Sequence, residues 1–239
     1  MDPRSGTTGE PVGEPNVLPR QRWRLVLARS ADAPELAGRE LADAWEQAIA
    51  SSGLPLQRGS GSGKARVAWG APLSGRMGAE RELVEIVLHE ALPVWHVREA
   101  LIRCLPIGWS LVDLHDVWLG APALAGRVTG AVYRVALDGD APADAVAAAA
   151  LRLLEAGQLI RTRTRGGTPV AYDLRPLLAD IDVVQPGPPV VIRVETRIHP
   201  ERGSGRPEEV VAALADVVGR PLAPAWIVRE RLIVAGEPG

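Results

Sequence analysis

Twice along the chain, a short segment in which apolar and polar residues alternate precedes an amphipathic helix that ends at glycine. Residues 22–27 show the alternation first, residues 132–137 repeat it, and the helices that follow end at Gly53 and Gly157. Alternation with period two is typical of a strand with one buried face, and glycine is common just past a helix end. Strands and covering helices therefore follow one another, which predicts an α+β fold.

The same reasoning gives an order of elements for each half of the chain. In the first half we expect strands at 22–27, 54–58 continued at 66–69, 82–88 and 109–118, and helices at 35–52 and 93–106. In the second half we expect strands at 132–137, 159–165, 169–174, 181–184, 190–197 and 226–234, and helices at 142–157 and from 207 onward. If 54–58 and 66–69 form one interrupted strand, the first half reads βαββαβ, the ferredoxin-like plan.

These patterns divide the chain into three parts. Residues 1–19 have no apolar periodicity and are rich in Gly, Pro and Glu, which predicts a disordered leader. A segment rich in Gly, Ala and Pro at 119–126 separates the two halves. We therefore expect a first ferredoxin-like module at 20–119 and a second at 128–236, each with an antiparallel sheet.

Composition narrows the classes of protein that the chain can belong to. The chain has 239 residues, 46% of them hydrophobic, which suffices for a core. No apolar run approaches the ~18 residues of a membrane-spanning helix, and the net charge of −2 is unlike that of a strongly basic nucleic-acid protein. The single cysteine, Cys104, allows no internal disulfide and no cysteine-bound zinc or iron–sulfur cluster. With no apolar secretory signal at the start, a cytoplasmic protein is expected.

Three motifs resemble known sites, but each lacks a residue or the spacing that its chemistry requires. The run Gly59–Lys64 lacks the first glycine and the hydroxyl residue of a phosphate-binding loop. His89 and His96 are seven residues apart with a proline between them, so they do not form the His-Glu-x-x-His zinc motif. Asp113 and His115 share a strand face, but no nucleophile accompanies them. We therefore assign no catalytic residue, no metal ligand and no cofactor, and the residues favour a protein that is not an enzyme.

Basic residues recur at strand spacing and are the best candidates for a binding surface. Positions two apart on a strand point to one face, so each group predicts a row of cations. The candidate contact residues are Arg161, Arg163 and Arg165; Arg193 and Arg197; and Arg58, Lys64 and Arg66 around the glycine run of the first half, with Arg229 and Arg231 at similar spacing near the end. If these strands are neighbours, they form a basic sheet face, and the acids collect on helices and loops. Such a face is either simply solvated, or it contacts RNA phosphates or an acidic surface of a partner protein.

Short stretches in order along the chain resemble the family of radical-SAM-linked (radical-SAM-associated) proteins, which is defined by a domain of unknown function. The matching stretches are Arg22-Trp23-Arg24-Leu25, Trp45-Glu46-Gln47-Ala48, Ser52 to Leu56, Val67 to Leu73, Glu80 to Leu88, Tyr133-Arg134-Val135, Asp173 to Leu177 and Arg206 to Val210. Two regions depart from the family pattern: residues 30–36 lack its histidine, and residues 59–64 lack its aromatic residue and prolines.

The resemblance implies a role beside a radical SAM protein, and it supplies no catalytic residues. The three closely spaced cysteines of a radical SAM cluster are absent, so this chain is not itself the radical enzyme. We expect a non-catalytic accessory protein that presents substrate to a radical SAM partner or docks on it through the arginine-rich sheet face. The alternative is an RNA-binding or RNA-processing protein that uses the same face.

Overall fold

The computed structural model describes residues 18–36, 38–59, 63–74, 76–165 and 167–237, and the expected leader therefore lies almost wholly outside the described residues. The first half contains β1 (Gln21–Arg29), α1 (Gly38–Ser51), β2 (Val67–Trp69), β3 (Gly78–Leu88), α2 (Val94–Cys104) and β4 (Trp109–Asp116), followed by the short α3 (Leu124–Arg127). The second half contains β5 (Val128–Asp138), α4 (Ala143–Glu155), β6 (Ile160–Arg165), β7 (Thr168–Asp173), the 3₁₀ turn η1 (Arg175–Leu177), β8 (Leu178–Gln185), β9 (Val191–His199), β10 (Gly203–Ser204), α5 (Pro207–Val218) and β11 (Ala223–Val234).

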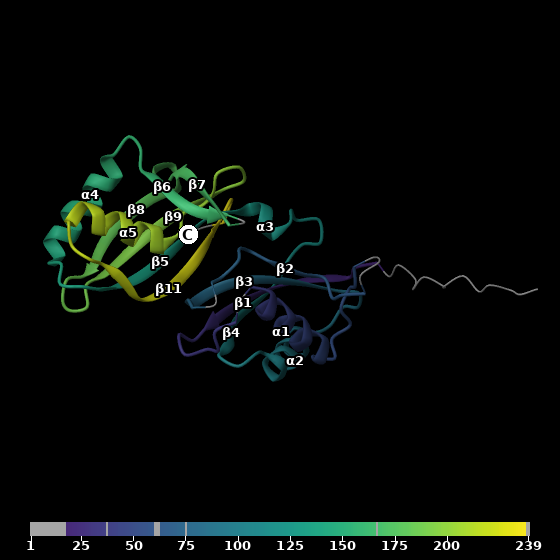
Figure 1. Cartoon of the computed structure of the whole chain (residues 1–239). Helices are drawn as coiled ribbons and strands as arrows, with labels where there is room; N and C mark the ends of the chain where they lie inside the picture. Colours follow the sequence, from purple (N-terminus) through teal and green to yellow (C-terminus); the bar gives the residue numbers. More distant parts are fainter. Residues whose placement is uncertain (1–17, 37, 60–62, 75, 166, 238–239) are drawn as a thin grey trace, which may run out of the picture.

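Nine of these strands form one mostly antiparallel sheet that runs through both halves (Figure 1). Its order is β10-β9-β5-β11-β3-β1-β4, with β2 paired to β3 and β8 paired to β9. The halves meet where β11 and β3 pair in parallel at Val228–Gly78 and Arg229–Ala79. The α+β class is confirmed, whereas the description as tandem ferredoxin-like modules at 20–119 and 128–236 stays a prediction.

Most expected elements are present, with two differences. The expected strand at 54–58 is reduced to two isolated bridges, Leu56–Leu88 and Arg58–Ala65. The expected strands at 159–165 and 169–174 exist as β6 and β7, but they pair only with each other and lie outside the main sheet. No helix in the described ranges is long and apolar enough to cross a membrane.

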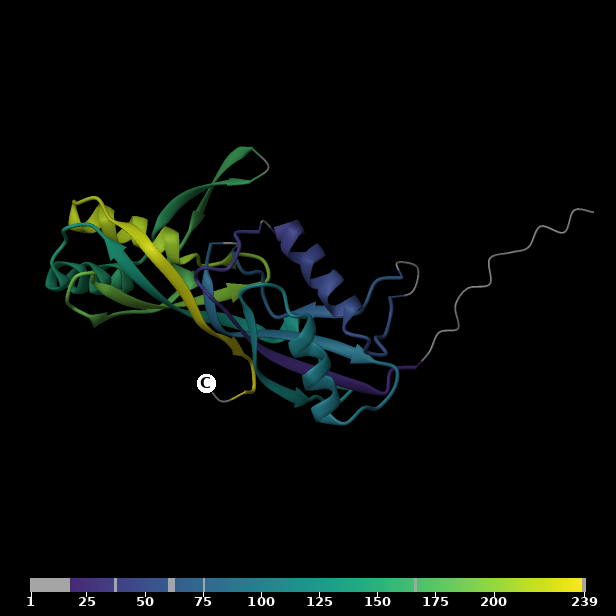
Figure 2. The same cartoon turned by 90° about the horizontal axis from the view of Figure 1, so that it is seen from below.

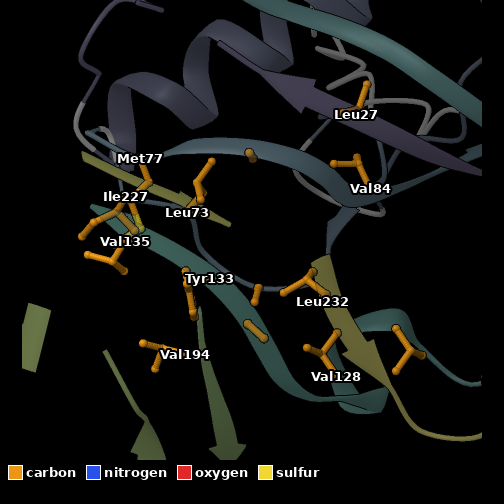
Figure 3. Packing of buried hydrophobic residues seen from close by; sticks show 14 of the residues in the cluster. Leu27, Leu73, Met77, Val84, Val128, Tyr133, Val135, Val194, Ile227 and Leu232 are labelled. Atoms are coloured by element: carbon orange, nitrogen blue, oxygen red, sulfur yellow. The ribbon is translucent and has the colours of Figure 1, made fainter. Parts of the chain in front are cut away.

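The core lies between the sheet and the helices. Trp45 of α1 packs edge-on against Trp69 and Trp109, with ring centres 5.3 and 5.1 Å apart. Leu73 and Met77, from the segment before β3, lie between Leu27 and Val84 of the first half and Tyr133, Val135 and Ile227 of the second (Figure 3). One hydrophobic core therefore continues from one half into the other.

Strand β1 is buried on both faces, although its alternation predicts one buried face. Trp23, Leu25 and Leu27 point into the core, and on the other face Arg22 and Arg24 are also buried. Glu85 of β3 accepts hydrogen bonds from both guanidinium groups, at 2.9 Å from Arg22 Nε and 2.8 Å from Arg24 Nη2. Acids therefore do not collect only on helices and loops, because carboxylates on the sheet hold these arginines.

Candidate functional site

The β6–β7 hairpin carries Arg161, Arg163 and Arg165, and it projects from the body of the protein (Figure 2). It forms a two-stranded sheet of its own, so β6 is not a neighbour of β9 or β11. The arginines of β6 therefore share no sheet face with Arg193 and Arg197. The side chain of Arg165 lies outside what the structure describes.

The described arginines of the hairpin turn toward helix α5. Arg161 forms an ion pair with Asp216 of α5, and the guanidinium carbon of Arg163 lies 4.6 Å from the centre of the Tyr172 ring. Burial, with the carboxylate of Glu209 beside it, raises the pKa of Tyr172, so this phenol stays neutral. Arg163 forms no ion pair with any carboxylate in the described part of the chain, and its positive charge is not offset by a salt bridge.

The base of the hairpin is fixed by Asp173 and Arg175. Asp173 Oδ1 accepts hydrogen bonds from the backbone N–H groups of Leu159 and Arg175, at 2.8 and 3.0 Å. Arg175 donates to the carbonyl oxygens of Leu154 and Leu178, which joins the end of α4 to the start of β8. These contacts give the Asp173–Leu177 stretch a structural role at the point where the hairpin leaves the body.

Beyond its base, the hairpin leaves apolar side chains and strand edges uncovered. Ile160 is 58% exposed and Val170 is 40% exposed. Within the described residues, neither strand has a second partner, so the outer edges of both β6 and β7 present backbone groups that can pair with another strand. The hairpin is therefore an anchored element with a free edge.

Arg193 and Arg197 on β9 are engaged within the molecule. Arg193 Nε lies 3.2 Å from Glu230 Oε2, and Arg134 Nε lies 2.8 Å from the other oxygen of Glu230. Arg197 donates to the carbonyl oxygens of Pro176 and Leu178. The charge of this sheet face is thus partly compensated, and its expected contact with RNA or a partner stays a prediction.

Of the basic residues of the first half, Arg58 lines a small cavity, whereas Lys64 and Arg66 do not line it. Arg58 donates to the carbonyl oxygen of Gly63, and Lys64 Nζ lies 2.7 Å from Glu46 Oε2. The hydrogen bond to Glu46 raises the pKa of Lys64. Beside them is a cavity of about 170 Å³, lined by Glu46, Ala50, Leu54, Pro55, Leu56, Arg58, Ala65 and His89. Arg66 is exposed nearby.

A β-bulge separates the last two arginines, whose spacing predicts a shared face. Arg229 pairs with Tyr133 and Arg231 pairs with Val132, so the register shifts at Glu230. Because adjacent residues of β5 point to opposite faces, Arg229 and Arg231 do too. Arg229 is buried and bound to Glu82, whereas Arg231 lines a second cavity.

This second cavity lies where β3 and β11 diverge after their short parallel contact. It has a volume of about 420 Å³ and is lined by Arg81, Leu83, Arg231, Leu232, Ile233, Val234 and Glu237. Sequence reasoning missed it, since its residues come from strands about 150 positions apart. The only local signal is that Arg81 and Leu83 alternate on one strand, as Arg231 and Ile233 do on the other.

The acid–base candidates form a surface ion pair. His115 Nε2 lies 3.3 Å from Asp113 Oδ2, closer than the strand spacing suggests, and Arg98 Nη2 lies 3.6 Å from Asp113 Oδ1. All three side chains are partly exposed. Within the described ranges, no three His, Cys, Asp or Glu side chains gather in a way that could hold a metal ion.

The sequence matches one family profile, described as an uncharacterized protein conserved in bacteria (DUF2344), over residues 22–207. A search of curated proteins finds no match. Among solved structures, similar chains are found in a Cbf5-Nop10-Gar1 complex (TM-score 0.49, 10% identity) and in an archaeal box H/ACA sRNP Nop10-Cbf5 complex (TM-score 0.48, 13% identity). Each match covers 88% of this chain and about half of the other chain, 48% and 47% respectively. At these scores the similarity carries no functional argument.

Proposed function

The chain belongs to the DUF2344 family of uncharacterized proteins conserved in bacteria, which assigns it no activity, and we propose from the geometry that it is a non-catalytic docking protein. The observation that carries this proposal is the β6–β7 hairpin, which is anchored at Asp173 and Arg175 and leaves its strand edges uncovered. Two-stranded hairpins are marginally stable alone, so an uncovered one gains stability from a further strand.

The chemistry of the hairpin specifies the kind of partner. Its strand β6 carries Arg161 and Arg163, of which Arg161 pairs with Asp216 and Arg163 has no carboxylate partner among the described residues. An extended, acidic segment of a partner protein can pair with the hairpin edge and complement this charge. The sequence resemblance makes a radical SAM protein the first partner to test, in the cytoplasm.

In this proposal the docking hairpin is an added element of the second half of the chain. We interpret residues 20–119 and 128–236 as ferredoxin-like modules, because β4-β1-β3-β2 and β11-β5-β9-β8 follow equivalent orders. The β6–β7 hairpin is then an insertion between the first helix and the second strand of the second module. An insertion that adds nothing to the main sheet is free to serve binding.

The proposal is tested by affinity purification of the tagged full chain from its host extract, with and without RNase. We expect one radical SAM protein to be recovered irrespective of RNase and to bind the purified chain directly. The informative variant replaces Arg161, Arg163 and Arg165 with serine. Among the described side chains, the variant loses one ion pair and one ring contact, which costs only ~1–2 kcal/mol of stability, so circular dichroism should show an intact fold while partner binding is lost.

A matched variant changes Arg193 and Arg197 on β9 to serine and should retain the partner. Equal recovery of the partner by wild-type and hairpin variants contradicts the proposal. Recovery of RNA, or of proteins that disappear after RNase treatment, together with loss of this binding in the β9 variant, supports the RNA-binding alternative instead.

A further inference from the structure

The geometry points to a second binding site in the cavity between β3 and β11, which would take a small organic phosphate monoester. Arg81 and Arg231 would bind the phosphate group, and the apolar side chains of Leu83 and Ile233 would contact its organic part. This inference does not depend on the hairpin or on docking, since the cavity is built from other strands.

Two arginines that line the cavity form no ion pair with a described carboxylate. Neither Arg81, which is exposed, nor the half-buried Arg231 forms an ion pair or a side-chain hydrogen bond within the described part of the chain. They come from different strands, and both side chains line the same cavity. Guanidinium groups match the geometry of phosphate oxygens, and two unpaired cations match the double negative charge of a phosphate monoester.

The one carboxylate in the lining does not oppose an anion, because it is already neutralised. Glu237 Oε1 lies 2.6 Å from Arg24 Nη1 and 3.0 Å from Arg127 Nη2. Burial alone would lower the pKa of Arg24, and its hydrogen bonds to Glu237 and Glu85 raise it above the usual value. Around the cavity, cations therefore outnumber carboxylates.

The size of the cavity favours an organic molecule over a bare ion. A volume of about 420 Å³ falls within the range of small-molecule sites, which is roughly 300–1,000 Å³. Inorganic phosphate would meet the two arginines but leave the walls formed by Leu83, Leu232 and Ile233 uncovered. A ligand with a phosphate at one end and an apolar body would use both.

The site is tested with phenyl phosphate and inorganic phosphate, titrated separately into the full chain by calorimetry. We expect phenyl phosphate to bind more tightly than inorganic phosphate. Arg81→Gln and Arg231→Gln should each weaken phenyl phosphate binding about tenfold or more, since each removes a charge-assisted contact. Neither side chain has a partner among the residues that the structure describes, so thermal unfolding should be unchanged. Arg39→Gln, at an exposed position of α1 outside the cavity, is the matched control and should bind as the wild type does.

A separate variant tests the apolar wall. Leu83→Glu places a carboxylate in the cavity and should abolish phenyl phosphate binding; because Leu83 is half-buried and packs against the hydrophobic core, circular dichroism should confirm that this variant is folded. The inference is overturned if phenyl phosphate does not bind, or if Arg39→Gln weakens binding as much as Arg81→Gln does. It is also overturned if, in competition, a short RNA without a terminal phosphate displaces phenyl phosphate at a lower concentration than other phosphate monoesters do.

Discussion

At the scale of single residues, the described arginines of this protein differ in what holds them: carboxylates, backbone carbonyl oxygens, an aromatic ring, or no partner among the described residues. Arg22 and Arg24 share Glu85, and all three side chains are buried on the face of β1 and β3 opposite the helices. Buried charges are tolerated when they are paired and hydrogen-bonded. The half-buried Arg231 has no ion pair among the described residues, so it is a ligand-binding candidate together with the exposed Arg81 beside the same cavity.

The thiol of Cys104 gives a prediction at this scale. Burial raises its pKa, and its Sγ lies 3.2 Å from the carbonyl oxygen of Leu101, to which it donates a hydrogen bond. A raised thiol pKa means less thiolate at pH 8, and the thiolate is the reactive form. We expect iodoacetamide to modify the folded protein more slowly than the chain unfolded in urea, as followed by mass spectrometry. Equal rates in the two states would contradict the burial of this thiol.

At the scale of elements, the hairpin depends on one aspartate at its base. Asp173→Ala removes the acceptor of two backbone hydrogen bonds, from Leu159 and Arg175. We expect a loss of about 1–3 kcal/mol in unfolding free energy, with faster amide exchange in β6 and β7 than in the main sheet. Hydrogen exchange measured by mass spectrometry resolves the two regions. Asp173→Asn keeps the accepting oxygen and is the control; faster exchange spread evenly over all strands would contradict the local role.

The elements themselves could largely be predicted from the sequence, because one buried face imposes a period-two or helical pattern on each. The presence of α1 and of strands β3, β5 and β9 follows such patterns, although β3 and β5 each begin four residues before the expected start. Pairing could not be predicted in this way. Nothing near Arg229 signals that its partner is Glu82, 147 positions away, and the bulge at Glu230 that separates Arg229 from Arg231 has no local glycine to announce it. The sites that depend on pairing therefore appear only in the folded chain.

At the scale of the whole molecule, the two halves are joined by the sheet and by a buried ion pair. The parallel contact between β3 and β11 is only two residue pairs long. Leu73 and Met77 add apolar packing between the halves, and Arg229 also donates to the carbonyl oxygens of Ala71 and Pro72. These contacts lie at one junction, so the stability of each half should depend on the other.

The ion pair between Glu82 and Arg229 tests this dependence. Both side chains are almost completely buried, at 0% and 3% exposed. Burial alone would lower the pKa of Arg229, but the charge and hydrogen bonds of Glu82 raise it, so the guanidinium stays charged inside the protein. Removal of one partner of a buried pair leaves an uncompensated charge, and Glu82→Gln should cost about 3–5 kcal/mol.

Because the pair joins the halves, we expect Glu82→Gln to lower one shared thermal transition rather than to separate two transitions in calorimetry. The double variant Glu82→Leu with Arg229→Met removes both charges and should recover most of the lost stability, since an apolar pair of similar volume needs no desolvated ions. If Glu82→Gln instead lowers one of two resolved transitions and leaves the other unchanged, the halves fold independently. The ion pair would then stabilise one half only, and the continuous sheet would not act as a cooperative unit.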